Sequence, residues 1–343
     1  MILALVLATM ALGPAGASPT VNSVGRNGFL RTDGIWIVNS EGRRILLRGV
    51  NYPGLSWEPQ PDKHKEAAYR RFAEIGCNVV RLPISWAHLE PLPGVFDDKY
   101  LYGYVDKDIR WARKYGLFVV LDMAQWKWAE RFGGNGVPDW AVQAYPPTEG
   151  GMRKFASDFW VNSTLQGHLS QVWRWVASIY ANEPTIAGYD LFNEPWSYTL
   201  MDSNMTAKYV HEFYLNVIES VRDVDLNHMI FLEPIGTNSL NITLEKSIVW
   251  SPHFYPLAFT PTYFAENVTL LEADLAAKYR KFVIEFAKPM WIGEFGAFMK
   301  DDSYINWLHD AIGLFDRYQI GWAWWPINEG LRQQIPSVIS LSS

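Results

Sequence analysis

Short apolar segments with the composition of strands alternate with longer segments of helical pattern along most of the chain. This alternation limits the possible folds more than any other feature of the sequence. Strands separated by helices align in parallel, and eight such units in 343 residues favour a closed barrel over an open sheet. We therefore predict an α/β fold, a single (β/α)8 TIM barrel. The predicted strands are Ile45–Asn51, Asn78–Pro83, Leu117–Met123, Ile186–Phe192, Met229–Leu232, Ser247–Phe254, Met290–Gly293 and Gly321–Trp325. The predicted helices are Lys65–Ile75, Leu101–Tyr115, Ser157–Tyr180, Ala207–Asp223, Leu271–Ala287 and Tyr304–Tyr318.

Ahead of the barrel, the segments Phe29–Val38 and Arg43–Asn51 flank Asn39–Gly42, which has the residues of a turn. We predict an N-terminal β-hairpin that caps the closed end of the barrel. No linker composition separates a second domain, so residues 18–343 are expected to form one domain. No G-x-G-x-x-G sequence opens a helix, which counts against a dinucleotide-binding fold.

The first residues have the pattern of a secretory signal. Met1–Ala17 contains a short apolar run followed by small residues that suit cleavage, and the run is too short to span a bilayer. We expect a secreted protein with residues 1–17 removed, and an uncleaved membrane anchor is the lesser alternative. Four N-glycosylation sequons, at Asn162, Asn204, Asn241 and Asn267, agree with export.

Composition narrows the choice of partners. A net charge of −6 and a pI near 5.7 give no reason to expect nucleic acid as a partner, since nucleic-acid binding needs clustered Lys and Arg. The seven histidines show no paired metal-ligand spacing, so neither a metal site nor a cofactor is predicted. Asp106 and Asp108 read as helix surface, and Cys77, the one cysteine, reads as a buried, unreactive thiol. No obligate protein partner is evident.

Two glutamates stand where strands are predicted to end. Glu194 lies in Asn193-Glu194-Pro195 after an apolar strand, and Pro195 ends the strand because it has no N–H to donate. Glu294 lies in Gly293-Glu294-Phe295-Gly296 after a second apolar strand. In a (β/α)8 barrel the carboxyl ends of the strands form the face that carries the chemistry. We therefore expect Glu194 and Glu294 to face one site, although each taken alone could be an ordinary surface residue.

A pair of carboxyl groups of this kind suits glycoside hydrolysis. One carboxylic acid protonates the leaving oxygen, and the other carboxylate attacks the anomeric carbon or activates a water. A separation of about 5 Å gives retention of configuration, and a wider gap gives inversion. The acid/base glutamate must be protonated at the start, so we expect burial or a neighbouring charge to raise its pKa.

The same motifs are similar to those of glycoside hydrolase family 5, the cellulase-type barrels. Besides the two glutamate motifs, Asn78-Val79-Val80-Arg81 resembles the second strand of that family. Pro252-His253-Phe254-Tyr255 resembles the sixth strand, and Trp325 the end of the eighth. The resemblance covers nearly the whole chain after the proposed signal. It implies an O-glycosyl hydrolase whose general acid/base is Glu194 and whose nucleophile is Glu294.

The resemblance also implies roles for five substrate-binding residues. Asn193 would hold the 2-hydroxyl of the sugar, and Arg81 would keep the nucleophile ionised. Tyr255 would contact the nucleophile, and His253 would orient the acid/base. Trp325 would form the floor of the sugar subsite next to the cleaved bond.

Within the family, the passages Leu121-Asp122-Met123 and Val137-Pro138-Asp139-Trp140 resemble endoglycoceramidases. One departure is that Ala124 and Trp126 stand where those enzymes carry His and Asp, which weakens the case for a glycolipid substrate. We expect a secreted, retaining β-glycosidase that cleaves a β-glucan or related β-glycan, as endoglucanases and cellulases do. An endoglycoceramidase-type enzyme is the alternative, and a non-catalytic sugar-binding barrel is a lesser one.

Overall fold

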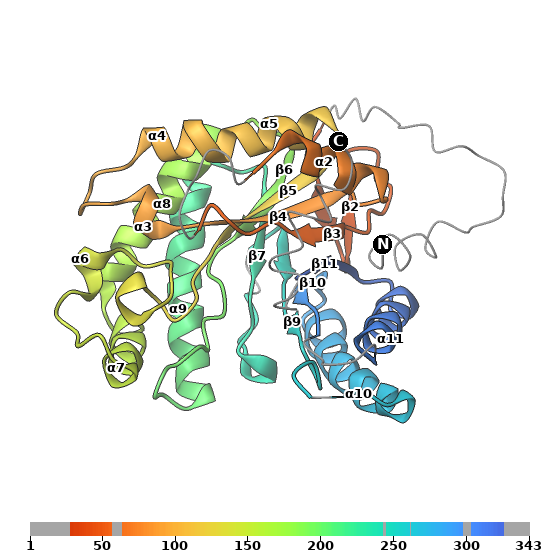
Figure 1. Cartoon of the computed structure of the whole chain (residues 1–343). Coiled ribbons are helices and arrows are strands. Elements are labelled where there is room, and N and C mark those ends of the chain that lie inside the picture. The colour runs from red at the N-terminus through yellow and green to blue at the C-terminus, as the bar shows by residue number, and fades with distance from the viewer. Residues whose placement is uncertain (1–27, 57–63, 243–244, 261, 298–302, 326–343) are drawn as a thin grey trace.

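A strongly curled parallel sheet forms the centre of the molecule in the computed structural model, which describes residues 28–56, 64–242, 245–260, 262–297 and 303–325 (Figure 1). Within these residues the sheet has nine strands in the order β8-β7-β6-β5-β4-β3-β11-β10-β9. They are β3 (Arg48–Asn51), β4 (Val79–Ile84), β5 (Phe118–Met123), β6 (Ile186–Asp190), β7 (Met229–Leu232), β8 (Ile248–Trp250), β9 (His253–Phe254), β10 (Trp291–Phe295) and β11 (Gly321–Trp324).

The two outermost strands of this order are consecutive in the chain. Only Ser251 and Pro252 separate β8 from β9, and β8 pairs with β7 whereas β9 pairs with β10. Trp250 also forms a parallel bridge to Met290, and its N–H donates to the carbonyl of Pro289 at 2.9 Å. The predicted sixth strand is therefore one strand interrupted by Pro252, and the sheet closes on itself. The prediction of a (β/α)8 barrel is confirmed.

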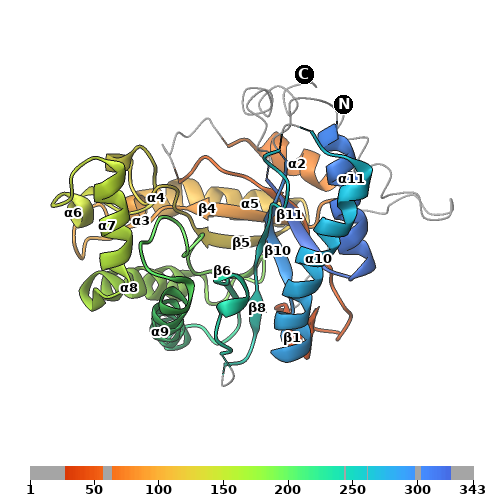
Figure 2. The same cartoon turned by 90° about the horizontal axis from the view of Figure 1, so that it is seen from below.

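Helices surround the outside of the curled sheet, as the two perpendicular views show (Figure 1, Figure 2). The long helices predicted from residue 157 and from residue 101 each divide in two. In the first of these segments one helix ends at Phe159 and another begins after Asn162. In the segment from residue 101, a π-helical turn over Leu101–Val105 precedes the regular helix, and a short helix over Asp98–Tyr100 comes before that turn. The helices are α2 (Glu66–Glu74), α3 (Trp86–Leu89), α4 (Asp98–Tyr100), α5 (Asp106–Lys114), α6 (Asp139–Val142), α7 (Glu149–Phe159), α8 (Ser163–Tyr180), α9 (Ser203–Arg222), α10 (Val268–Tyr279) and α11 (Ser303–Arg317). π-Helical turns η1 (Leu101–Val105) and η5 (Arg280–Glu285) precede α5 and follow α10.

The N-terminal hairpin is present, but its main turn differs from the predicted one. β1 (Arg31–Asp33) pairs antiparallel with β2 (Trp36–Val38) around Gly34, whose φ of 57° places it in the left-handed region that glycine tolerates. The predicted turn at Asn39–Gly42 also forms, but it leads only to an isolated bridge between Val38 and Arg44. Gly34 and Ile35 therefore form the turn of the hairpin, and Asn39–Gly42 forms the turn that follows it.

An apolar layer fills the amino-terminal half of the barrel and explains why the hairpin sits there. Side chains in a strand alternate between faces, so residues two apart share the barrel interior. Leu30 and Ile37 of the hairpin segment join the strand residues of this buried cluster and close it off. The strand residues include Val79, Val120, Phe231, Val249 and Trp291.

Asp108 was predicted to lie on the surface of its helix, and this is wrong. The side chain is fully buried beneath α5 and its carboxylate lies 2.5 Å from Nδ1 of His64. A buried carboxylate requires a polar partner of this kind. The periodicity of a single helix does not reveal a partner that lies 44 residues away in the chain.

The buried thiol of Cys77 agrees with its prediction, and burial raises the pKa of this group to about 12. In the described part of the chain, no helix combines the length and apolar character needed to cross a bilayer. The proposed signal, Met1–Ala17, lies outside the described residues, so export stays a prediction.

Candidate active site

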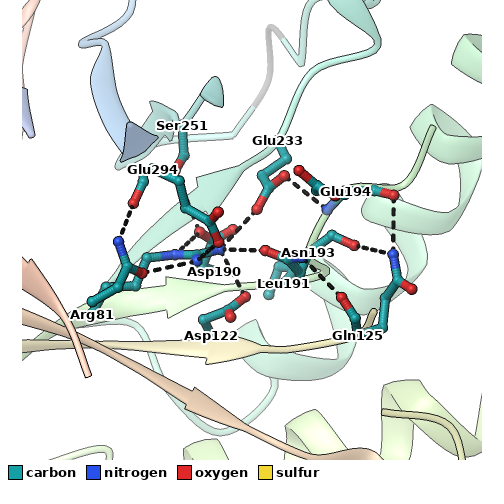
Figure 3. A network of polar contacts seen from close by, with 12 residues as sticks. Arg81, Asp122, Gln125, Asp190, Leu191, Asn193, Glu194, Glu233, Ser251 and Glu294 are labelled. Atoms are coloured by element: carbon teal, nitrogen blue, oxygen red, sulfur yellow. Dashed lines mark hydrogen bonds and ion pairs between the residues drawn. The ribbon is translucent and has the colours of Figure 1, made fainter. Parts of the chain in front are cut away.

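A layer of charged side chains lies directly above the apolar layer of the barrel. Arg81 is two residues beyond Val79, and Asp122 is two residues beyond Val120, so both side chains share the interior face with those valines. The same step leads from Phe231 to Glu233 and from Val249 to Ser251. Alternation along neighbouring strands thus brings an arginine and several carboxylates to one level near the carboxyl ends of the strands (Figure 3).

The guanidinium of Arg81 lies at the centre of this layer and is fully buried. Its Nη1 is 2.7 Å from Glu294 Oε1, and its Nε donates to Asp190 at 3.0 Å. Its Nη2 is 2.8 Å from Glu233 and 2.9 Å from Asp122. Four carboxyl groups surround a single guanidinium, which is the arrangement that the planar fork of arginine can serve and a lysine cannot.

These carboxyl groups cannot all be ionised around one cation in a buried site. Burial raises the pKa of Asp122 well above its ordinary value, and the neighbouring carboxylates raise it further against the effect of Arg81. Burial likewise raises the pKa of Glu233 to about 7, against the opposing effects of His253 and Arg81. The layer therefore holds protons at neutral pH as well as charges.

The two glutamates singled out by the sequence face each other across this layer. One carboxylate oxygen of Glu194, one of Glu294 and a ring nitrogen of His253 all lie within 4.8 Å of one another. Glu294 is 9% exposed at its side chain and Glu194 is 26% exposed, so both are sheltered and both remain accessible. This spacing is that of retaining glycosidases, whose carboxyl groups are about 5 to 5.5 Å apart, and leaves no room for the intervening water of an inverting enzyme.

Residues around the nucleophile candidate hold it from several sides. Tyr255 donates its hydroxyl to Glu294 Oε2 at 2.8 Å, the contact that the sequence resemblance implied. Gly293 precedes Glu294, and a Cβ at Gly293 would lie 2.5 Å from Ser251 Oγ. Glycine at this position therefore leaves room for the Ser251 hydroxyl beside β10. This is a physical reason for a glycine directly before Glu294.

His253 connects the two glutamates with the charged layer. Its Nδ1 lies 3.0 Å from Glu194 Oε1 and 3.5 Å from Glu294 Oε2, and its Nε2 lies 3.0 Å from Glu233 Oε1. Although burial lowers the pKa of His253, Glu233 and Glu294 raise it well above its ordinary value. His253 is thus held as an imidazolium between three carboxyl groups.

The backbone of Glu194 has an unusual conformation. Its φ is 47°, in the left-handed region that costs a non-glycine residue about 1–3 kcal/mol. The N–H of Glu194 donates to Glu233 Oε2 at 2.8 Å, and Gln125 Nε2 donates to the carbonyls of Asn193 and Glu194 at 2.9 and 3.2 Å (Figure 3). Hydrogen bonds on both sides of the residue therefore hold the strained turn that aims its carboxylate.

The pKa of Glu194 is lowered, and the expectation that it would be raised is wrong. Burial does raise the pKa, but the hydrogen bond and the charge of His253 outweigh it. The family resemblance implied that His253 orients Glu194, but it gave neither the distance between the two groups nor the burial that together decide the direction of the pKa shift.

The remaining predicted residues lie at the same face. Asn193 accepts a hydrogen bond from Arg81 at 3.0 Å and donates to the carbonyl of Gln125 at 3.0 Å, so its amide is engaged by protein groups. Trp325 follows β11, and its N–H donates to the carbonyl of Phe295, the residue after Glu294, at 2.7 Å. Of the two departures from the family pattern, Ala124 is buried and Trp126 is 41% exposed.

Three members of the charged layer were not identified from the sequence: Asp122, Asp190 and Glu233. The sequence does contain an indication for Glu233, because Leu232-Glu233-Pro234 repeats the pattern of a strand followed by Glu and Pro that is seen at Asn193-Glu194-Pro195. Asp122 and Asp190 end apolar strands and pair in register across β5 and β6. Nothing in the strand patterns indicates that both turn toward the same arginine.

Among the residues that the structure describes, two groups of side chains have the donor atoms that a metal ion needs. One is Glu194, His253 and Glu294, and the other is Asp122, Asp190 and Glu233. In the second group Arg81 supplies the positive charge, so the carboxylates already have a cation among them. In the first group the ring of His253 supplies the positive charge between the two glutamates.

Comparison with known proteins places this arrangement in a family. The model of the cellulase family, glycosyl hydrolase family 5, matches residues 38–330, which is most of the chain. The chain belongs to glycoside hydrolase family 5. It is thus a glycoside hydrolase, a β-glycosidase with a TIM barrel, and the family resemblance seen in the sequence is confirmed.

Individual members of family 5 resemble the chain at similar levels. Endoglycoceramidase I of Rhodococcus hoagii is 29% identical in an alignment of 195 residues that covers 49% of this chain and 37% of that protein. Endoglucanase C of Acetivibrio thermocellus is 25% identical in an alignment of 306 residues that covers 74% of this chain and 80% of that protein. The crystal structure of an endogalactoceramidase superimposes with a TM-score of 0.75 at 25% identity and covers 92% of this chain and 78% of that one. These family 5 relatives therefore include enzymes named for glycans and enzymes named for glycolipids.

Proposed function

We propose that this family 5 enzyme cleaves β-glycosidic bonds with retention of configuration, with Glu194 as the general acid/base and Glu294 as the nucleophile. The observation that carries the proposal is the approach of the two carboxyl groups, with oxygens within 4.8 Å. At that distance Glu294 can attack the anomeric carbon directly while Glu194 serves the leaving oxygen on the opposite side.

The surrounding residues support this division of roles. Arg81 and Tyr255 each donate to one oxygen of Glu294, which holds this carboxylate in a fixed orientation. The carboxylate of Glu194 is contacted instead by Nδ1 of His253 at 3.0 Å and by the hydroxyl of Ser197 at 3.3 Å. His253 can supply a proton to Glu194, so this side of the site is suited to acid/base chemistry.

As substrate we propose a β-linked glycan, with a glycolipid as the second candidate. The second candidate is favoured by an exposed aromatic side chain next to the site. Phe259, on the segment after β9, is 66% exposed, and its ring lies 5.8 Å from the ring of Tyr255. An exposed ring beside the tyrosine that contacts Glu294 suits an alkyl chain linked to the sugar.

One experiment tests the mechanism. Purified protein is incubated with a panel of β-glucans, β-mannans, cello-oligosaccharides and a lactosyl glycolipid, and the first-formed anomer is followed by ¹H NMR. We expect β-anomer products, and Glu294→Gln should lower kcat on the order of 10⁴-fold or more because the attacking group is lost. Glu212→Gln, an exposed glutamate of α9, is the matched control and should retain activity. First-formed α-anomer, or full activity of Glu294→Gln, would overturn the assignment.

The same panel decides the substrate class. Hydrolysis of glucans or mannans with no release of oligosaccharide from the glycolipid supports the glycan. The reverse result supports the glycolipid, and then Phe259→Ser should raise KM for the glycolipid and leave the KM for a soluble aryl glycoside unchanged.

A further inference from the structure

The carboxyl group of Glu233 contacts the backbone of Glu194 and also the histidine that contacts the Glu194 side chain, although Glu233 stands 39 residues from Glu194 in the chain. Its Oε2 accepts the backbone N–H of Glu194 at 2.8 Å. Its Oε1 lies 3.0 Å from Nε2 of His253, whose other nitrogen, Nδ1, lies 3.0 Å from the Glu194 carboxylate. A single fully buried carboxyl group thus contacts the strained backbone of Glu194 and, through one imidazole, its side chain.

We propose that Glu233 is a positioning residue for the acid/base Glu194, and that it fixes His253 so that Glu194 and His253 share the proton given to the leaving oxygen. This inference rests on the proposed function. Oε1 of Glu233 lies within ion-pair distance of Nε2 of His253 without forming an aligned hydrogen bond, and its charge favours a proton on that nitrogen. The other ring nitrogen, Nδ1, is then free to give its proton to Glu194 and to take it back.

The surroundings of Glu233 and His253 leave few other routes for this proton. Glu233, after β7, faces Arg81 from β4 at 2.8 Å and accepts a hydrogen bond from Tyr214 of α9 only at its backbone carbonyl. Asp190 of β6 and Asp122 of β5 are two further carboxyl groups that contact the same Arg81. His253 faces Glu194, Glu294 and Glu233, with the edges of the Trp196 and Tyr255 rings against it.

The reaction balances with this shared proton. In the first step Glu294 forms a bond to the anomeric carbon, the bond from that carbon to the leaving oxygen breaks, and the proton held between Glu194 and His253 moves to that oxygen. In the second step a water oxygen bonds to the anomeric carbon and the bond to Glu294 breaks. A proton of that water returns to the Glu194–His253 pair. The contact with His253 lowers the pKa of Glu194, and this agrees with a proton that the two residues share.

The test uses leaving groups that differ in their need for a proton. Wild-type enzyme and Glu233→Gln are compared on phenyl and 2,4-dinitrophenyl β-cellobiosides and β-lactosides. A dinitrophenolate leaves without protonation, whereas a phenolate requires the acid. We expect Glu233→Gln to lose about 10²-fold in kcat/KM on the phenyl glycosides and less than about 10-fold on the dinitrophenyl glycosides. Glu194→Gln provides the reference pattern for complete loss of the acid.

Asp122→Asn is the matched control, because it removes another buried carboxyl group that contacts Arg81. Any loss in this variant should be equal on the two leaving groups. An equal loss on both leaving groups in Glu233→Gln as well would overturn the inference and leave the proposed function intact. If the wild-type enzyme cleaves none of the four glycosides or the panel substrates, the proposed function fails instead.

A second measurement does not depend on the folding of Glu233→Gln. ¹⁵N-histidine NMR of the wild-type enzyme at about pH 7.5, where a histidine of ordinary pKa is mostly neutral, reports both ring nitrogens, with His253 assigned by its absence in His253→Gln. We expect two protonated nitrogens. A neutral ring with an unprotonated Nε2 would contradict the proposed arrangement.

Discussion

At the scale of single residues, Arg81 organises the site more than either glutamate does. It is the residue that satisfies Asn51, Asp190, Asn193, Glu233 and Glu294 with hydrogen bonds from one planar group. A buried ion pair of this kind costs desolvation energy that only close, multiple contacts offset. Removal of the guanidinium would leave buried carboxylates without a partner. The loss of Arg81 should therefore lower the free energy of unfolding as well as the catalytic rate.

Arg81→Lys tests this at the same scale. A lysine keeps the charge but cannot donate in several directions at once, so we expect the free energy of unfolding to fall by about 3–5 kcal/mol. Urea denaturation followed by tryptophan fluorescence measures the change. Arg110→Lys is the control, since Arg110 makes an exposed ion pair with Asp106, and its effect should be below about 1 kcal/mol. A loss at Arg81 as small as that of the control would contradict the role given to the guanidinium.

At the scale of elements, capping residues fix where the long helices begin and so where the loops of the active face lie. α8 starts at Ser163 because Asn162 accepts the N–H of Leu165 at 3.1 Å. α9 starts at Ser203 because Asp202 accepts two backbone N–H groups. An Asn or Asp in this position satisfies donors that the helix leaves open. The sequon at Asn162 therefore coincides with a helix cap.

Replacement of this cap separates its structural part from glycosylation. In protein made without glycosylation, Asn162→Ala should lower the free energy of unfolding by about 1 kcal/mol, and Asn162→Ser should restore most of it because serine also caps. Both variants lack the sequon, so the difference between them reports the cap alone. Identical denaturation curves for the two would argue against the cap.

At the scale of the whole molecule, the barrel combines an apolar layer closed by the hairpin with a charged layer that opens on the active face. The apolar layer supplies burial, and the charged layer carries groups whose pKa values differ from those in the unfolded chain. Differences of this kind link folding to pH.

Stability should fall as the pH rises from about 5 to 8. Glu233 has a pKa near 7 in the folded protein against 4.5 unfolded, so the folded state binds more protons between these values, and its contribution disappears as the pH rises through about 7. His253, whose pKa is also raised, acts in the same direction above its unfolded value of 6.5. Glu194 and Asp225, whose pKa values are lowered, already contribute fully at pH 5. Thermal unfolding across this range measures the slope, and Glu233→Gln should flatten it. A Tm that increases toward pH 8 would contradict the prediction.

The sequence by itself determined the features that depend on neighbours in the chain. The alternation of strands and helices, the ends of those strands and the position of Glu194 and Glu294 after them follow from local periodicity and from Pro195 and Gly293. It also indicated the family, and through the family the contacts of Arg81 and Tyr255 with Glu294.

Only the tertiary structure decided how the charges are arranged. The pairing of Asp108 with His64, the entry of Asp122, Asp190 and Glu233 into the layer around Arg81, and the lowered pKa of Glu194 all depend on distances between residues far apart in the chain. Electrostatic interactions depend on such distances and on burial, and neither is encoded in the local pattern of a strand.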